Sequence, residues 1–190
     1  MPEKIFLSSE DLHNDALKLA LQILNSGFRP KAIIALWRGG TPIGIAVQEF
    51  LDHYGNTQSD HIAIRTSSYS GIGNQSRQVK IHGLGYLVKN LNRNDPLLIV
   101  DDVFDTGRTI EALIDELKLK CRNNTPEDIR IAVPWYKPAK NETKRIPDYY
   151  IHTTTQWIKF PFSLEGLTVE EIKQHRPQIY KIIKPALDKL

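Results

Sequence analysis

The sequence contains a single cysteine, Cys121, and no long run of apolar residues. One cysteine excludes an internal disulfide framework. No segment approaches the roughly 20 apolar residues that a helix needs to span a bilayer. The N-terminal stretch MPEKIFLSSEDLHND lacks a positive region followed by an apolar one, so it does not have the pattern of a signal peptide. We therefore expect a cytoplasmic protein with no membrane partner.

The excess of positive over negative charge is also small, because the formal net charge is only +3. The Lys and Arg residues do not cluster into one block. That distribution gives no electrostatic footprint for nucleic acid, and a small basic excess suits anionic small molecules equally well. The 41% hydrophobic and 25% charged residues are typical of a soluble globular protein. A chain of 190 residues is long enough for one domain with a proper core, with or without a small hood.

The most informative segment is LLIVDDVFDTGRTI, residues 97–110. Leu97 to Val100 are apolar and bounded by Asp95-Pro96 and by charge, which predicts a buried strand. Two adjacent carboxylates follow, Asp101 and Asp102. A short hydroxyl-rich turn then opens into residues 109–120, whose apolar positions have helical spacing.

Such a turn between a strand and a helix directs backbone N–H groups and the positive end of the helix dipole to one point, which suits a phosphate. The two acids upstream can accept hydrogen bonds from vicinal hydroxyls or help arrange a metal. A ligand with sugar hydroxyls and a phosphate fits both halves. The alternative is an ordinary strand-to-helix turn in which Asp102 or Asp105 caps the helix.

The rest of the chain alternates between strands and helices. A first helix is expected from Ser8 or Ser9 to about Ser26, and the C-terminal region 167–190 looks helical with interruptions at Pro177 and Pro185. Between them, strands are expected at 31–37, 60–67, 97–100 and 129–136, a helix over 43–50, and a polar, mobile loop over 68–80. This order predicts an α/β protein with a parallel sheet, whose ligands bind at the carboxyl ends of the strands.

The segment 97–110 closely resembles the phosphoribosyl-diphosphate binding motif of the type I phosphoribosyltransferases: an apolar strand, two acids, then D-T-G-x-T. The resemblance implies that family's fold, a mostly parallel central sheet flanked by helices. It implies one domain over 1–190 with a base-binding hood at about 137–166, to which the terminal segments could contribute. It also assigns Asp101 and Asp102 to the ribose and, directly or through water, to Mg²⁺. The resemblance assigns binding of the 5-phosphate to Asp105, Thr106, Gly107, Arg108 and Thr109.

The turn after the first expected strand resembles the family's diphosphate-binding loop. It contributes Arg38 with the amides of Gly39 and Gly40, and a cis peptide is expected at Trp37–Arg38 or at the bond before it. In purine-salvage members a Ser-Tyr pair opens a flexible loop that closes over the site. Here that loop contains Ser68, Tyr69, Lys80 and Arg77, the last as a candidate diphosphate ligand. The alternative is a solvated loop with incidental charges.

The base-binding residues are suggested by Lys137 in the context Tyr-Lys-Pro-Ala and by the later segment TQWIKFPF. Both resemble the hood of 6-oxopurine transferases. The lysine there donates to the exocyclic O6, an aromatic residue (here Trp157) stacks on the purine, and the next residue (here Ile158) presents backbone groups to its other edge. Alternatively, Lys137 is a surface lysine and Trp157 a core residue.

One departure from the family concerns the position after the aromatic-Pro-aromatic turn, where relatives often carry an acid. This chain has Ser163, Leu164 and Glu165 there, so the acid is displaced or absent. The preference among guanine, xanthine and hypoxanthine therefore stays open, as does any role for Glu165 or Ser163.

Taken together, the resemblance implies a Mg²⁺-dependent purine salvage enzyme that transfers ribose 5-phosphate from phosphoribosyl diphosphate to a 6-oxopurine. Asp105 would take the proton of purine N7 as the general base, and a homodimer or homotetramer is expected. Two other functions stay open. One is a regulator of the same fold that senses phosphoribosyl diphosphate, and the other is a transferase for a pyrimidine or another base.

Overall fold

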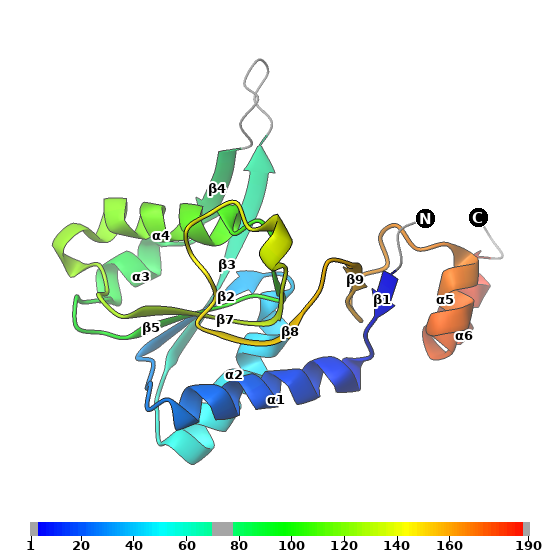
Figure 1. Cartoon of the computed structure of the whole chain (residues 1–190), viewed down its shortest axis with the longest axis horizontal. Helices are drawn as coiled ribbons and strands as arrows, with labels where there is room; N and C mark the ends of the chain where they lie inside the picture. Colours follow the sequence, from blue (N-terminus) through cyan, green and yellow to red (C-terminus); the bar gives the residue numbers. More distant parts are fainter. Residues whose placement is uncertain (1–3, 70–77, 188–190) are drawn as a thin grey trace. The chain divides into compact units, whose positions relative to one another are not determined.

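The computed structural model describes residues 4–69 and 78–187 and divides the chain into two compact units. The larger is formed by residues 10–155. The smaller combines the N-terminal segment up to Ser9 with residues 156–190 (Figure 1). The expectation of one domain with a hood at about 137–166 stays a prediction, and the boundary between the units falls inside that range.

The larger unit is built on one sheet with the order β4-β3-β2-β5-β7-β6, and β8 pairs with β7. Every pairing is parallel except that of β3 with β4. A mostly parallel α/β sheet is thus confirmed. The strands are β2 (Ala32–Trp37), β3 (Asp60–Tyr69), β4 (Gln78–His82), β5 (Leu97–Val100), β6 (Val103–Phe104), β7 (Ile129–Tyr136) and β8 (Tyr149–Thr153).

Four helices cover the two faces of this sheet, with α1 and α2 on one side and α3 and α4 on the other (Figure 1). The central strands are apolar on both faces because both are covered. Ile34, Leu36 and Ile99, for example, belong to the core shared with α3 and α4. The helices are α1 (Ser9–Asn25), α2 (Gly40–Gly55), α3 (Gly85–Asn90) and α4 (Arg108–Cys121), and short 3-10 turns cover Arg122–Asn124 and Pro138–Lys140.

The loop predicted over 68–80 was wrong at both ends. Ser68 and Tyr69 end β3, and Lys80 lies within β4. The two strands form an antiparallel ladder from the Arg65–His82 pair to the Tyr69–Gln78 pair. Main-chain hydrogen bonds along that ladder outweigh the polar, aperiodic character of the segment. Arg77, the candidate diphosphate ligand, lies outside the described residues.

The strand that carries the motif is interrupted at the two acids. β5 and β6 both pair with β7 in one register, since Leu97 lies opposite Ile129 and Val103 opposite Trp135. In that register Pro134 lies opposite Asp102, and proline has no N–H to donate to the ladder. The amide of Asp101 still donates to the carbonyl of Ala132 over 3.2 Å, so the ladder is interrupted at Asp102, just beyond the carboxyl end of β5.

The smaller unit contains a two-stranded parallel sheet of β1 (Lys4–Phe6) and β9 (Trp157–Lys159), followed by α5 (Val169–His175) and α6 (Pro177–Leu187). Thr168 begins α5 with a capping box in which Glu171 takes part. The predicted break at Pro177 is confirmed. The break at Pro185 was wrong, because Pro185 lies inside the last turn of α6, where a missing N–H removes only one helical hydrogen bond. Across residues 4–69 and 78–187, no helix is long and apolar enough to cross a membrane.

Candidate functional site

A pocket of about 70 Å³ lies where the loop Asp105-Thr106-Gly107 joins β6 to α4. Gly107 precedes the helix in a left-handed conformation (φ 79°), and no side chain caps the helix start. Apart from a long contact of the Arg108 amide with Oγ1 of Thr106 (3.5 Å), the first N–H groups of α4 are therefore left for an anion, at the positive end of the helix dipole. The residues that line the pocket are Asp101, Val103, Phe104, Asp105, Thr106, Gly107, Thr109 and Ile110.

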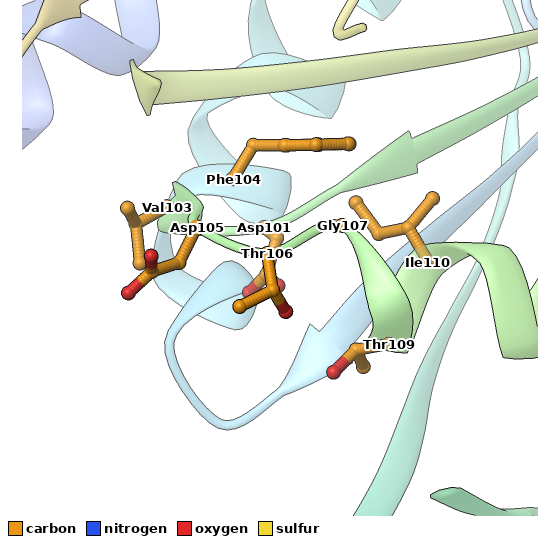
Figure 2. Close-up of a pocket in the computed structure, with 8 residues that line it drawn as sticks. All are labelled: Asp101, Val103, Phe104, Asp105, Thr106, Gly107, Thr109 and Ile110. Carbon is orange, nitrogen blue, oxygen red and sulfur yellow. The ribbon is translucent and has the colours of Figure 1, made fainter. Parts of the chain in front are cut away.

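The hydroxyl side chains of this pocket share one side of the loop. Figure 2 shows Thr106 and Thr109 on the side away from Phe104 and Ile110. Glycine is required at 107 for two reasons. The positive φ disfavours other residues, and a Cβ would lie 2.6 Å from Oγ1 of Thr143 and 2.7 Å from Cζ of Phe104. The loop is thus a fixed cradle of main-chain donors with two hydroxyls on one side.

A second segment supports this cradle from behind. The amide of Glu142 donates to the carbonyl of Thr106 over 3.0 Å, and its carboxylate pairs with the guanidinium of Arg108. The Arg108 side chain is thereby directed to Glu142, so the contribution of Arg108 to an anion is that of its backbone. The sequence reasoning missed Glu142 and Thr143, and the only local signal is the turn in which the side chain of Asn141 accepts the amide of Thr143 over 2.9 Å.

The acid pair lies beside this pocket and is partly buried. The amide of Asp102 donates to Oδ1 of Asp101 over 2.9 Å. Burial raises the pKa of Asp101 well above its ordinary value, and the adjacent Asp102 carboxylate raises it further. Burial also raises the pKa of Asp102, although hydrogen bonds and the charge of Arg38 act in the opposite direction. Two carboxylates in this state favour a ligand that brings positive charge or hydroxyl donors.

The loop after β2 lies directly against the acids. The Trp37–Arg38 peptide is cis, as expected. A Cβ on Gly39 would lie 2.0 Å from Oδ2 of Asp102, and one on Gly40 would lie 2.4 Å from the carbonyl oxygen of Val100. Both glycines are therefore required by the close approach of this loop to the acid-bearing strand. Helix α2 begins here without a side-chain cap, which leaves a second group of N–H donors beside the exposed Arg38.

Lys137 follows β7 and is only 3% exposed, so the alternative of a surface lysine was wrong. Its amide donates to the carbonyl of Phe104 over 2.9 Å, and its Nζ lies 3.6 Å from Oδ2 of Asp105. The other oxygen of Asp105 is buried and has no hydrogen-bond partner in the described part of the chain. A buried carboxylate oxygen without a donor is costly, and it marks a position where a ligand N–H would be accepted.

In the smaller unit, Trp157 is 51% exposed, so the alternative of a core residue was wrong. The side chain of Ile158 is buried, but its main chain lies on a free edge. The amide of Leu7 donates to the carbonyl of Lys159 over 3.1 Å, so the peptide groups of Lys159 face β1. Those of Ile158 face the opposite way, where no described strand pairs with β9.

Ser163 and Glu165, which lie near the position where relatives often carry an acid, make hydrogen bonds within the smaller unit. The carbonyl of Glu165 accepts Nζ of the buried Lys159 over 2.8 Å, and the carbonyl of Ser163 accepts from Arg176. Lys159 and Arg176 were not singled out from the sequence, where nothing distinguishes them from surface cations.

The structure thus brings four predicted features together in the larger unit, at the carboxyl ends of β2, β5, β6 and β7: the phosphate loop, the acid pair, the 38–40 loop and Lys137. Trp157 and Ile158 belong to the smaller unit. In the described part of the chain, no group of three or more His, Cys, Asp or Glu side chains could hold a metal ion. Two adjacent carboxylates still fit Mg²⁺, which typically binds one or two protein carboxylates together with water and substrate phosphates.

Comparisons with known proteins agree with this geometry. Residues 8–167 match the family described as phosphoribosyl transferase domain. A hypoxanthine-guanine phosphoribosyltransferase from Streptococcus pyogenes is 28% identical over 86% of this chain and 85% of its own length. The fold is similar to a purine phosphoribosyltransferase from Pyrococcus horikoshii (26% identity, TM-score 0.68, 87% of this chain and 97% of that one). It is also similar to a Neisseria gonorrhoeae protein with bound ppGpp (25% identity, TM-score 0.72, 96% and 98%).

Proposed function

The chain belongs to the phosphoribosyl transferase family, and we propose that within this family it transfers 5-phosphoribosyl from phosphoribosyl diphosphate to a 6-oxopurine. The products would be a purine nucleoside monophosphate and diphosphate. The observation that carries the proposal is the buried Lys137 beside Asp105, because this pair stands next to the phosphate loop and offers both a donor and an acceptor to a base. The names of the relatives in Streptococcus pyogenes and Pyrococcus horikoshii support it.

In this proposal the sugar phosphate is held by two of the features described above. The N–H groups of the loop 105–109, with the hydroxyls of Thr106 and Thr109, bind the 5-phosphate. The carboxylates of Asp101 and Asp102 accept the ribose hydroxyls. Binding of hydroxyl donors offsets the burial that raises the pKa of both acids.

The leaving diphosphate is assigned to the 38–40 loop. Arg38 supplies a cation, and the amides of Gly39 and Gly40 approach the ligand without side chains. Arg77 remains a proposed diphosphate ligand. Ser68, Tyr69 and Lys80 belong to β3 and β4 and are not assigned to a loop.

Base recognition is assigned to Lys137 in the larger unit and to Trp157 and Ile158 in the smaller one. The ammonium of Lys137 has donors and no acceptor, so it suits the O6 of a 6-oxopurine and not the amino group of adenine. The exposed ring of Trp157 provides a stacking surface, worth about 1–3 kcal/mol per base. The free peptide groups of Ile158 suit the opposite edge of the purine.

Magnesium is proposed as the cofactor, held by Asp101 and Asp102 directly or through water. When bound, it would neutralise charge on the ribose and diphosphate oxygens. The residues of this chain would bind and orient the substrate around that charge: the 38–40 loop at the diphosphate, the 105–109 loop at the 5-phosphate.

Asp105 is the proposed general base for the proton on purine N7. Its buried oxygen without a hydrogen-bond partner is free to accept that proton, and Lys137 is close enough to orient the other oxygen. General-base catalysis is typically worth about 10²–10⁴-fold in rate. We therefore expect Asp105→Asn to lower kcat by about that range while the melting temperature stays near that of the wild type. A variant with wild-type kcat would remove Asp105 from the chemistry.

The proposal is tested by turnover of guanine, xanthine, hypoxanthine and adenine with phosphoribosyl diphosphate and Mg²⁺, followed by ultraviolet absorbance. Conversion of one or more 6-oxopurines with adenine inert would support it and identify the base. Efficient use of adenine would overturn the role of Lys137. Binding of phosphoribosyl diphosphate without conversion of any purine would favour a regulator of the same fold or a transferase for a pyrimidine or other base.

A further inference from the structure

The guanidinium of Arg176, between α5 and α6, is buried in the smaller unit with only 7% of the residue exposed. It donates to four main-chain carbonyls of one short segment. Nη1 contacts the carbonyls of Pro161 (3.3 Å) and Ser163 (2.6 Å), and Nη2 those of Lys159 (3.2 Å) and Phe160 (2.6 Å). One side chain thus donates hydrogen bonds to four of the five carbonyls of residues 159–163.

Burial of a charged group carries a large solvation cost. It lowers the pKa of Arg176, as expected for a cation taken out of water. In the described residues the acceptors of this guanidinium are neutral carbonyls, and Nε has no partner. The four hydrogen bonds offset part of this cost, and they fix the 159–163 turn, which the rigid fork of a guanidinium does better than a single ammonium.

The turn held in this way continues directly from β9. The carbonyl of Lys159 accepts both from Arg176 and from the amide of Leu7, the residue after β1. The amide of Ser163 closes the turn on the carbonyl of Phe160 over 3.0 Å. Lys159, also buried, extends the arrangement by donating to the carbonyl of Glu165. The position of β9 and its free edge at Ile158 is therefore coupled to Arg176.

The same contacts orient the donors of the turn. In a trans peptide the C=O and the N–H point in opposite directions. Since the carbonyls of Lys159, Pro161 and Ser163 face the guanidinium, the N–H groups of Phe160, Phe162 and Leu164 face away from it. In the 159–163 turn the carbonyls of Lys159, Pro161 and Ser163 therefore face Arg176, and the N–H groups that follow them face away from it.

We propose that Arg176 is a positioning residue for base recognition, which acts by fixing the 159–163 turn and with it Trp157 and the free edge of Ile158. This inference rests on the proposed function, because it assumes that these residues meet the purine. Arg176 does not touch the substrate and has no part in binding phosphoribosyl diphosphate. Its loss should therefore weaken recognition of the base and leave the sugar-phosphate site intact.

The test uses the full-length chain and the variants Arg176→Lys and Arg176→Met. We expect KM for the preferred 6-oxopurine to rise in the order wild type, Lys, Met, with displacement of the turn by about 1 Å costing up to about 100-fold in kcat/KM. KM for phosphoribosyl diphosphate should stay within about twofold. Binding of the nucleoside monophosphate, followed by quenching of Trp157 fluorescence against a Trp157→Phe blank, should weaken in the same order.

Glu171→Gln is the matched control, because it weakens the capping box of α5 and the ion pair with Lys4 without touching the carbonyls of the turn. It should lower the melting temperature and leave KM for the base unchanged. If Arg176→Met does not fold, Arg176→Lys carries the comparison. Equal changes in base KM for Glu171→Gln and the Arg176 variants, or equal changes in both substrates' KM values, would overturn the inference. A wild-type protein that neither converts nor binds purines would instead overturn the proposed function on which this inference rests.

Discussion

Gly40→Ala is expected to destabilise the protein, because the loop after β2 has no room for a methyl group at this position. A Cβ there would lie 2.4 Å from the carbonyl oxygen of Val100 and 2.9 Å from Cα of Asp101. Ordinary contacts begin at 3.4 Å, so main-chain atoms would have to separate by about 1 Å. Both atoms belong to the acid-bearing strand, and neither can move as a flexible side chain would.

Overpacking of this kind typically costs about 1–3 kcal/mol. The better helix propensity of alanine returns less than about 1 kcal/mol, since Gly40 is the first residue of α2. We therefore expect a net loss of about 2 kcal/mol in the free energy of unfolding. For a chain of this size that corresponds to a fall in Tm of about 4–8 °C. The separation of the two loops should also raise KM for phosphoribosyl diphosphate.

Differential scanning calorimetry of the ligand-free protein measures the first effect, and Gly85→Ala is the matched control. Gly85 also begins a helix, but a Cβ there meets nothing within 4 Å. That substitution should raise the free energy of unfolding by up to about 1 kcal/mol through the unfolded state. A Gly40→Ala protein with a Tm at or above that of the wild type would refute the close approach of the 38–40 loop to β5.

Two further predictions concern charged groups of the larger unit. The pKa of Asp101 is higher in the folded than in the unfolded state, so the folded state binds more protons above about pH 3.9 and stability falls as pH rises. Asp101→Asn removes that loss and keeps an acceptor for the amide of Asp102. Its Tm advantage over the wild type in thermal melts should therefore be absent near pH 3 and grow toward pH 7, and a difference independent of pH would contradict the assignment. Lys137→Met removes a charged donor worth about 1.5–3 kcal/mol, so kcat/KM for a 6-oxopurine should fall about 10- to 100-fold at unchanged binding of phosphoribosyl diphosphate. An unchanged kcat/KM for the base would remove Lys137 from base recognition.

The parts of the fold that the sequence predicts well are those in which burial alone determines structure. β5 and β7 match their expected bounds because their apolar runs are bounded by proline or charge and both faces are covered. The expected helix at 109–120 is observed as α4, one residue longer at each end. Periodicity was informative at these places because hydrophobic burial and local propensity agree.

Shorter elements could not be predicted, because partners far along the chain create them. β6 has only two residues, and it is a strand because Trp135 and Tyr136 of β7 lie beside it. β1 and β9, with three residues each, pair across most of the chain. The extension of β3 into the predicted loop has the same cause, since the ladder with β4 supplies what local composition does not.

The candidate site divides in a similar way. The meeting of Gly39 with Asp102 could be anticipated, because both follow parallel strands whose carboxyl ends share one edge of the sheet. The support of the phosphate loop by Glu142 and of the 159–163 turn by Arg176 could not. The first is a main-chain hydrogen bond from Glu142 to Thr106 with an ion pair between Glu142 and Arg108, and the second joins one side chain to four carbonyls. Such contacts leave no periodicity or motif in the sequence.

The pairing of β1 with β9 has a consequence for the order in which the protein is made. Lys4 leaves the ribosome early, yet its partner Trp157 follows only after every strand of the larger unit has been synthesised. The core of the larger unit can therefore form before β1 pairs with β9. We expect a chain truncated near residue 155 and released from the ribosome to bind phosphoribosyl diphosphate without recognising a purine, and a bulky fusion at the N-terminus to slow the pairing of β1 with β9 most.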